Sequence, residues 1–269
     1  MVKFKKTLLT VILICIGVVS YAYENTYAIV VGVADYENFS ANNGDLTYTI
    51  SDAKRFAHFL MSKQGGSVPA ANIILLSDAR ASKANIIARA KSLFSKAKSN
   101  DRVIFFFSGH GSRGCFVPYD AGLNGGNMLY FSEVKSFFRN AKCNTKLIFA
   151  DACFSGSMKG LDKNVIRKTL LKENKAFSKM NIAVMMSCKG DETSLESGSL
   201  KQGLFTYYLM QGLSGKANFD RNEYVTIHEL FKYVYLKTKN EAATMNHNQT
   251  PELFGKFDLR LIVAKKTIN

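Results

Sequence analysis

Two short apolar runs in this chain each end beside a reactive side chain, and this pattern limits the possible folds more than any other. The run 103–107 is followed by Ser-Gly-His-Gly, with the histidine at position 110. The run 147–150 is followed by Asp-Ala-Cys-Phe-Ser-Gly, with the cysteine at position 153. Short runs rich in Ile and Phe and ended by Gly or Ser are typical of buried strands. The sequence therefore predicts two strands that deliver a histidine and a cysteine.

The segment between the two runs predicts that these strands are parallel. Residues 129–140 place Val134, Phe137 and Phe138 at helical spacing, so a helix can connect the strands. A helical crossover makes the strands it joins parallel, and ligands bind at the carboxyl ends of such strands. We therefore expect His110 and Cys153 to face each other. A thiol beside an imidazole is the minimum arrangement for nucleophilic catalysis by cysteine.

The two motifs, Ser108–Gly111 and Asp151–Gly156, resemble the catalytic pair of the caspase-like cysteine peptidases, the clan of caspases, metacaspases and clostripain. The resemblance is closest to bacterial metacaspase-like peptidases and covers nearly all of the chain after the first two dozen residues. It implies an α/β, three-layer caspase-haemoglobinase-like fold, with a mostly parallel central sheet of about six strands flanked by helices. Phe154 departs from the pattern, because metacaspases usually have histidine there.

The same resemblance implies the roles of the catalytic residues. Cys153 would attack the scissile carbonyl, and His110 would act first as base and then as acid. The backbone N–H groups of Gly111 and Cys153 would form the oxyanion hole.

The resemblance also implies that Asp52, Ser108 and Asp151 line a pocket for a basic side chain. Asp52 lies in the first turn of a helix expected at 51–61, where the helix dipole also favours an acid, and both roles can hold together. An alternative role for Asp151 is to orient the catalytic pair. Two carboxylates favour Arg or Lys and repel Asp, so cleavage after Arg or Lys is expected. The chain has no Trp and so lacks the Ser-Trp-Arg element of animal caspases.

Residues 1–22 are predicted to be a signal peptide. A basic start is followed by an apolar run at 8–19 and by Ser20-Tyr21-Ala22, which offers small residues at the positions a signal peptidase reads. The apolar run is short for a membrane span, and an uncleaved anchor is the alternative. The signal predicts export, to the periplasm or the outside of the cell.

Residues 23–269 are predicted to form one caspase-like peptidase domain, because no linker composition interrupts them. The resemblance divides it into a large-subunit-like part 23–156, a linker 157–180 and a small-subunit-like part 181–269. The linker is basic, and an enzyme that cuts after Lys or Arg would find many sites in it; a solvated helix is the alternative. The other expected strands are 26–33, 72–76 and 181–188, the other helices are 82–97, 203–213 and 226–239, and 251–263 is expected to complete the sheet.

The chain carries 36 basic and 21 acidic residues, a formal net charge of +15. The lysines are scattered and no basic helix is present, which argues against a nucleic-acid partner. We expect peptide or protein substrates with a basic residue before the cut, and no membrane contact once the signal is removed. The oligomeric state is not indicated.

The chemistry needs no cofactor, and no Cys-x-x-Cys pair or histidine cluster indicates a zinc site. Calcium activates some metacaspases, but the sequence shows no clear calcium site. Asp191 and Glu192 are candidates either for calcium or for enlarging the acidic pocket, and a solvated pair is the alternative.

The cysteine count leaves one alternative role for Cys153. With Cys15 in the signal, the exported chain keeps Cys115, Cys143, Cys153 and Cys188, which is enough for two disulfides. A free Cys153 leaves room for at most one bridge. Two alternative functions also stay open. One is a catalytically silent caspase-like binding or scaffold domain, and the other is the same fold with a different specificity.

Overall fold

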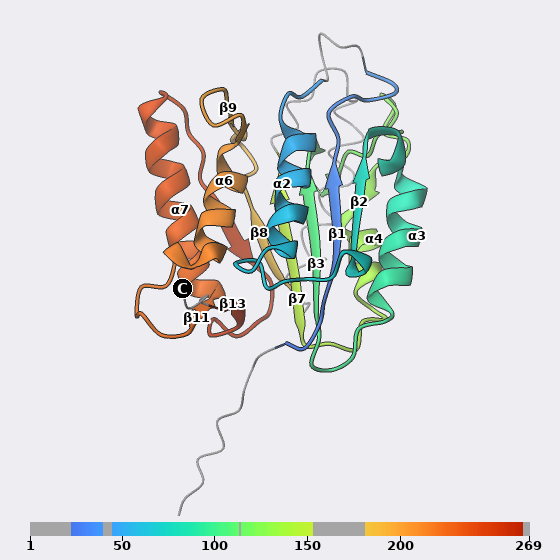
Figure 1. Ribbon diagram of the computed structural model, residues 1–269. Helices are drawn as coiled ribbons and strands as arrows, with labels where there is room; N and C mark the ends of the chain where they lie inside the picture. The colour runs from blue at the N-terminus through green and yellow to red at the C-terminus, as the bar shows by residue number, and fades with distance from the viewer. Residues whose placement is uncertain (1–22, 40–44, 113, 153–180, 266–269) are drawn as a thin grey trace, which may run out of the picture.

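The computed structural model describes residues 23–39, 45–112, 114–152 and 181–265. A six-stranded sheet with the order β12-β8-β7-β3-β1-β2 lies at its centre (Figure 1). All neighbouring strands in it are parallel except the antiparallel pair β12–β8. The strands are β1 (Thr26–Gly32), β2 (Ile73–Ser77), β3 (Arg102–Ser108), β7 (Thr145–Asp151), β8 (Ala183–Met186) and β12 (Glu252–Phe254).

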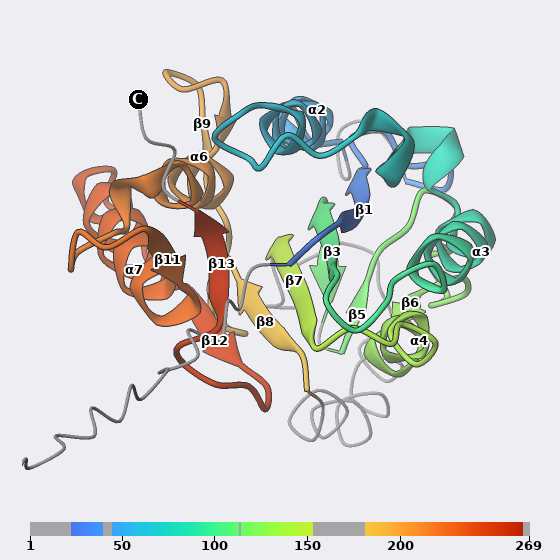
Figure 2. The ribbon, with the colours of Figure 1, turned by 60° about the horizontal axis from the view of Figure 1, so that its bottom comes forward.

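Helices cover both faces of the sheet (Figure 2). One face packs against α2 (Thr49–Met61), α6 (Leu204–Gln211) and α7 (Ile227–Thr244), and the other against α3 (Lys83–Phe94) and α4 (Phe131–Phe137). This three-layer α/β architecture confirms the predicted fold class. The remaining elements of the described ranges are three short helical turns and three small sheets. The turns are Ala70–Asn72, Asp78–Ala81 and Gly212–Lys216. The sheets are β4 (Gly111–Ser112) with β5 (Cys115–Phe116) and β6 (Leu129–Tyr130), β9 (Glu196–Ser197) with β10 (Gln202–Gly203), and β11 (Tyr224–Thr226) with β13 (Ile262–Lys265).

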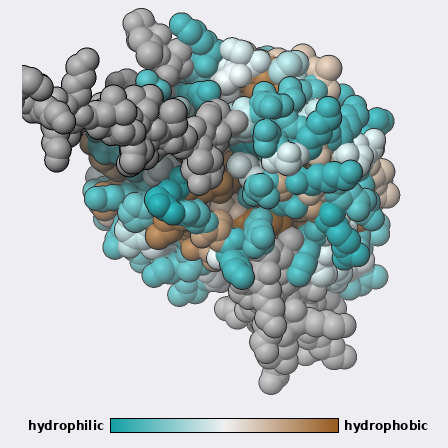
Figure 3. Space-filling model, turned by 90° about the horizontal axis from the view of Figure 1, so that it is seen from below, coloured by the Kyte–Doolittle hydropathy of each residue, from teal (hydrophilic) through white to brown (hydrophobic). Residues whose placement is uncertain are grey.

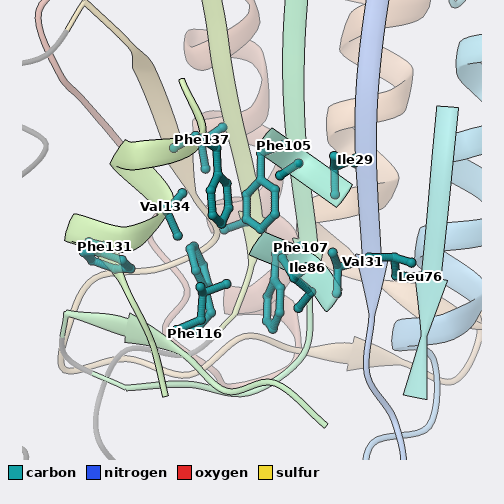
Figure 4. Packing of buried hydrophobic residues seen from close by; sticks show 14 of the residues in the cluster. Ile29, Val31, Leu76, Ile86, Phe105, Phe107, Phe116, Phe131, Val134 and Phe137 are labelled. Carbon is teal, nitrogen blue, oxygen red and sulfur yellow. The ribbon is translucent and has the colours of Figure 1, made fainter. Parts of the chain in front are cut away.

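The central strand β3 is buried along its whole length, which explains its uninterrupted apolar sequence. Its side chains alternate between two cores. Phe105 and Phe107 pack toward α3 and α4 (Figure 4), and Ile104 and Phe106 pack toward α2. The ring of Phe106 stacks on Phe56 of α2, with 4.4 Å between the ring centroids.

A close approach between β1 and α2 brings the start of the helix to the carboxyl edge of the sheet. A Cβ atom on Gly32 would lie 2.7 Å from both the Cβ of Ala53 and the carbonyl oxygen of Thr49. Only glycine therefore fits at the end of β1 without displacing α2. The hydroxyl of Thr49 also donates to the carbonyl of Val33 at 2.8 Å. Together these contacts place Asp52, in the first turn of α2, beside the ends of β1 and β3.

The helix predictions hold in type, but their ends differ. The segment predicted as a helix over 129–140 begins as strand β6, and its helix α4 ends at Phe137. Helix α7 runs on to Thr244 and begins with a capping box formed by Thr226 and Glu229.

The prediction that 251–263 completes the sheet is correct only for its first part. Strand β12 joins the sheet, whereas β13 pairs with β11 in a separate two-stranded sheet. Gly255 separates the two strands with a φ of 121°, a conformation that favours glycine and ends the extended run.

Seen from the amino-terminal ends of the strands, the surface is mostly hydrophilic, with hydrophobic residues visible between the polar ones (Figure 3). Among the helices of the described ranges, none combines the length and apolar composition needed to cross a membrane. The predicted signal peptide 1–22 and the predicted linker 157–180 lie outside the described residues.

The stacking of Phe106 on Phe56 predicts a large loss of stability on truncation. Phe106→Ala should lower the free energy of unfolding by about 3–5 kcal/mol, because it opens a cavity in a core closed on all sides. Urea denaturation measures this, with Phe219→Ala as the control. Phe219 is 51% exposed, so its truncation should cost less than about 0.5 kcal/mol. Equal losses in the two variants would contradict the described packing.

Candidate active site

Strands β3 and β7 pair in parallel, so that Ser108 lies opposite Asp151. The carboxyl end of the pair is held by a hydrogen bond from the Gly109 N–H to the Asp151 carbonyl, 3.2 Å long. His110 follows Ser108 by two residues, and Cys153 follows Asp151 by the same number in the sequence. Cys153 itself lies outside the described residues. The structure therefore places His110 at the sheet edge where the chain continues toward position 153.

Gly111 presents its backbone N–H away from the neighbouring strand. The His110 carbonyl accepts a hydrogen bond from the Val117 N–H at 3.0 Å, which makes residues 110 and 117 a hydrogen-bonded pair. The next pair along the β4–β5 ladder is Gly111 with Phe116. In an antiparallel ladder this pair is of the non-hydrogen-bonded kind, whose N–H groups point outward.

The three residues predicted to form the acidic pocket lie together. Asp52 and Asp151 are only 1% and 6% exposed. A carboxylate oxygen of Asp52 accepts a hydrogen bond from the hydroxyl of Ser108 at 3.3 Å. The Gly203 N–H, which begins α6, donates to both oxygens of Asp52 at 3.1 Å. The backbone N–H and the hydroxyl of Thr206 donate to Asp151 at 3.1 and 2.7 Å.

Asp52, Ser108, Asp151 and His110 line a single pocket of about 50 Å³. This volume is roughly that of two water molecules, so its charge distinguishes the pocket more than its size. Two larger pockets, of about 480 and 580 Å³, lie at the amino-terminal ends of the strands and contain none of the predicted site residues. The other residues lining the small pocket are Leu46, Thr49, Gly109, Ala152, Ser194, Leu195, Glu196 and Gly203.

The pKa values of the two buried carboxyls, Asp52 and Asp151, are both raised, which favours their protonated forms. The pKa of Asp52 is raised to about 8, chiefly by burial and next by the charge of Asp151, while hydrogen bonds from Gly203 and Ser108 oppose the shift. Burial also raises the pKa of Asp151, against the hydrogen bonds from Thr206. Two acids this close titrate as a pair, because ionising both places like charges together in a dry site.

Residues 25–260 match the sequence model of the caspase domain. The chain belongs to the caspase-domain family. A probable protease from a Desulfuromonadales bacterium is 24% identical over 258 residues, which cover 84% of this chain and 31% of that protein. The chain thus spans about a third of the length of this relative.

Solved structures agree with the caspase-domain fold. Caspase-1 from Spodoptera frugiperda matches with a TM-score of 0.63 and 15% identity, over 93% of this chain and 94% of that one. A crystallised protein from Geobacter sulfurreducens matches with a TM-score of 0.61 and 15% identity, over 90% of this chain and 100% of that one. The predicted resemblance to caspase-like peptidases is therefore confirmed, while the roles of individual residues stay predictions.

Sequence reasoning missed an acid that lines the pocket of this caspase domain. The carboxylate of Glu196 accepts hydrogen bonds from the N–H groups of Thr47 and Tyr48 at 3.0 and 2.6 Å, and so caps the start of α2. No local pattern identifies Glu196, because its partners lie about 150 positions earlier in the chain. Gly203 and Thr206 were missed for the same reason.

Asp191 and Glu192, the candidates for calcium binding or for enlarging the acidic pocket, lie outside that pocket. Glu192 accepts hydrogen bonds from the N–H and hydroxyl of Thr250 at 2.6 and 2.8 Å, and neither Asp191 nor Glu192 lines the small pocket. Over the part of the chain that the structure describes, no group of three His, Cys, Asp or Glu side chains is arranged to hold a metal ion. Cys115, Cys143 and Cys188 are all buried.

The acid pair predicts how stability changes with pH. A carboxyl whose pKa is raised by folding stabilises the protein fully at low pH, and this contribution is lost as the pH rises through the folded pKa. The wild type should therefore lose on the order of 3 kcal/mol of unfolding free energy between pH 5 and 8. Asp52→Asn, which cannot ionise, should show a much flatter profile in urea denaturation. Asp35→Asn, at an exposed position, is the control, and parallel profiles of wild type and Asp52→Asn would contradict the buried pair.

Proposed function

We propose that this protein is an exported cysteine endopeptidase with a Cys153–His110 dyad that cleaves peptide bonds after Arg or Lys. The observation that carries the proposal is the in-register pairing of β3 with β7. It places His110, the buried acids and the route to position 153 at one edge of the sheet. Membership of the caspase-domain family supports the same chemistry.

In this reaction the Cys153 thiolate attacks the carbonyl carbon of the scissile bond, and the thioester forms as the amine leaves. His110 takes the thiol proton and returns it to the leaving amine. Water then hydrolyses the thioester. The N–H groups of Gly111 and Cys153 hold the oxyanion, and the outward direction of the Gly111 N–H supports this role.

Asp52, Asp151 and Ser108 select the residue before the cut. The raised pKa of Asp52 keeps a proton on the acid pair at neutral pH, and a guanidinium or ammonium group would replace that proton. An arginine can bond two carboxylate oxygens at once, and this geometry favours it further. An aspartate would add a third negative charge to a dry site and is rejected.

The remaining parts of the proposal come from the sequence. The basic and apolar start of the chain supports export to the periplasm or beyond. The chemistry needs no cofactor, and the partner is a peptide or protein with a basic residue before the cut. Seven basic residues in the linker 157–180 are candidate sites for self-processing: Lys159, Lys163, Arg167, Lys168, Lys172, Lys175 and Lys179.

The specificity is tested with fluorogenic peptides that differ only in the residue before the cut. Arg and Lys peptides should exceed Gln and Asp peptides in kcat/KM by on the order of 100-fold, because the buried acids reject groups that leave them unpaired. Asp52→Asn should reduce the Arg preference by about tenfold or more while leaving the Gln peptide unchanged. Preference for Asp, or for an uncharged residue, would overturn the basic specificity.

The catalytic pair is tested with Cys153→Ala and His110→Ala, each of which should abolish cleavage of every peptide in the panel. His58→Ala is the matched control, because His58 is an exposed residue of α2. A thiol-reactive probe that labels Cys153 only when His110 is present would support the dyad. If Cys153 is labelled equally in the wild type and in His110→Ala, and no peptide is cleaved, the catalytically silent binding domain is favoured instead.

Self-processing predicts a difference between two gel lanes. Wild-type protein should separate into two fragments cut within 157–180, whereas Cys153→Ala should stay intact. Mass spectrometry of the fragments should place each new carboxyl terminus at a Lys or Arg. Identical single bands from both proteins would remove self-processing from the proposal and leave the peptide specificity to stand on its own.

A further inference from the structure

Tyr36, in the loop after β1, makes two different contacts with His110. The His110 N–H donates to the Tyr36 hydroxyl oxygen at 2.7 Å. The tyrosine ring lies beside the imidazole, with 5.1 Å between the ring centroids and 36° between the ring planes. Tyr36 is only 2% exposed, so packing limits its own freedom. A fixed ring beside the imidazole restricts the orientations that the imidazole can adopt.

Among the described residues, hydrogen bonds hold three backbone atoms of the turn that carries His110, and one of these bonds is to the side chain of Tyr36. The Gly109 N–H donates to Asp151, and the His110 carbonyl accepts from Val117. Both bonds belong to the pairing of the backbone, so no side-chain substitution removes them. The third bond, from the His110 N–H to Tyr36, depends on one hydroxyl group. It can therefore be removed by itself.

The surrounding residues are fitted to Tyr36. A Cβ on Gly109 would lie 2.9 Å from the Tyr36 hydroxyl oxygen, so a larger residue would push the tyrosine away. Phe39 packs edge-on against the Tyr36 ring, with 5.7 Å between the centroids. On the other side, the N–H groups of Ala34 and Asp35 donate to one carboxylate oxygen of Asp78, at 2.9 and 3.2 Å. The loop is thus anchored both before and after Tyr36.

We propose that Tyr36 is a positioning residue that holds His110 in the orientation needed for proton exchange with the nucleophilic thiol. It fixes the main chain at His110 through its hydroxyl and the imidazole through its ring. The bonded N–H belongs to the peptide group between Gly109 and His110, one residue before the proposed oxyanion donor Gly111, so the same contact limits the movement of that donor. The kinetic consequence rests on the proposed peptidase function, whereas the contact with His110 does not.

Tyr36→Phe is the informative variant, because it keeps the ring and removes the acceptor for the His110 N–H. It should lower kcat by about tenfold and leave KM within about twofold, since a small misplacement of a catalytic group acts on the chemical step. Alkylation of Cys153 by iodoacetamide should slow in parallel. Tyr36→Leu, which removes both contacts, should lower both rates further. Tyr119→Phe is the matched control, because Tyr119 packs at the edge of the same core, and it should behave as wild type.

A second measurement uses the wild type alone and so does not depend on the folding of a variant. The amide hydrogen of His110 should exchange slowly with solvent, because it is bonded to a buried hydroxyl. Rapid exchange at His110 would overturn the inference. So would a folded Tyr36→Phe protein with wild-type kcat and a wild-type alkylation rate. A variant that loses thermal stability but keeps kcat per folded molecule also counts against positioning.

The outcomes separate this inference from the proposed function. Should the wild type cleave no peptide, the proposed function fails, and the alkylation rate of Cys153 still reports on Tyr36. A slower rate in Tyr36→Phe than in Tyr119→Phe supports the positioning role. Equal rates in these two variants reject it.

Discussion

The parallel, in-register pairing of β3 with β7 is the constraint on which the rest of the molecule depends. It sets Ser108 opposite Asp151, and from that pair the positions of His110 and of the chain leading to Cys153 follow. Helices bury both faces of these strands, so a one-residue slip in register would turn each side chain into the opposite core and disrupt the packing of both cores. The hydrophobic cores therefore determine which side chains meet at this edge of the sheet.

The acid pair sets the stability of the folded state against the recognition that we propose for it. Two carboxyls in a dry site disfavour the folded state at high pH, and a site without ligands would be more stable with neutral side chains. The fold tolerates them because Ser108, Gly203 and Thr206 donate hydrogen bonds to them. Removing the charge of Asp52 is expected to stabilise the protein and to weaken its selectivity, which is typical of sites kept for binding rather than for packing.

Local apolar runs in the sequence predicted the sheet and its parallel strands, and the family resemblance carried by two motifs implied that Asp52, Ser108 and Asp151 lie together. The sequence did not predict that Glu196, Gly203 and Thr206 belong to the pocket. Their partners are distant in the chain, and the residues around them have the composition of an ordinary loop and helix. Tyr36 was missed because nothing local distinguishes a tyrosine that packs on an imidazole from any other loop tyrosine. The sequence also did not predict the turn at Gly255, after which β13 pairs with β11 instead of joining the central sheet. Local patterns thus locate the strand ends, while contacts across the chain determine what surrounds them.

The pocket is assembled from both halves of the chain, and so is the sheet. Strand β8, from the second half, hydrogen-bonds directly to β7, and the N–H groups that bind Asp52 and Asp151 come from the start of α6. Besides the covalent connection through 153–180, noncovalent contacts within the described residues join these two parts of the chain, and those contacts shape the candidate pocket. A molecule with this connection severed still has a continuous sheet, so the two pieces would stay associated as one folded unit.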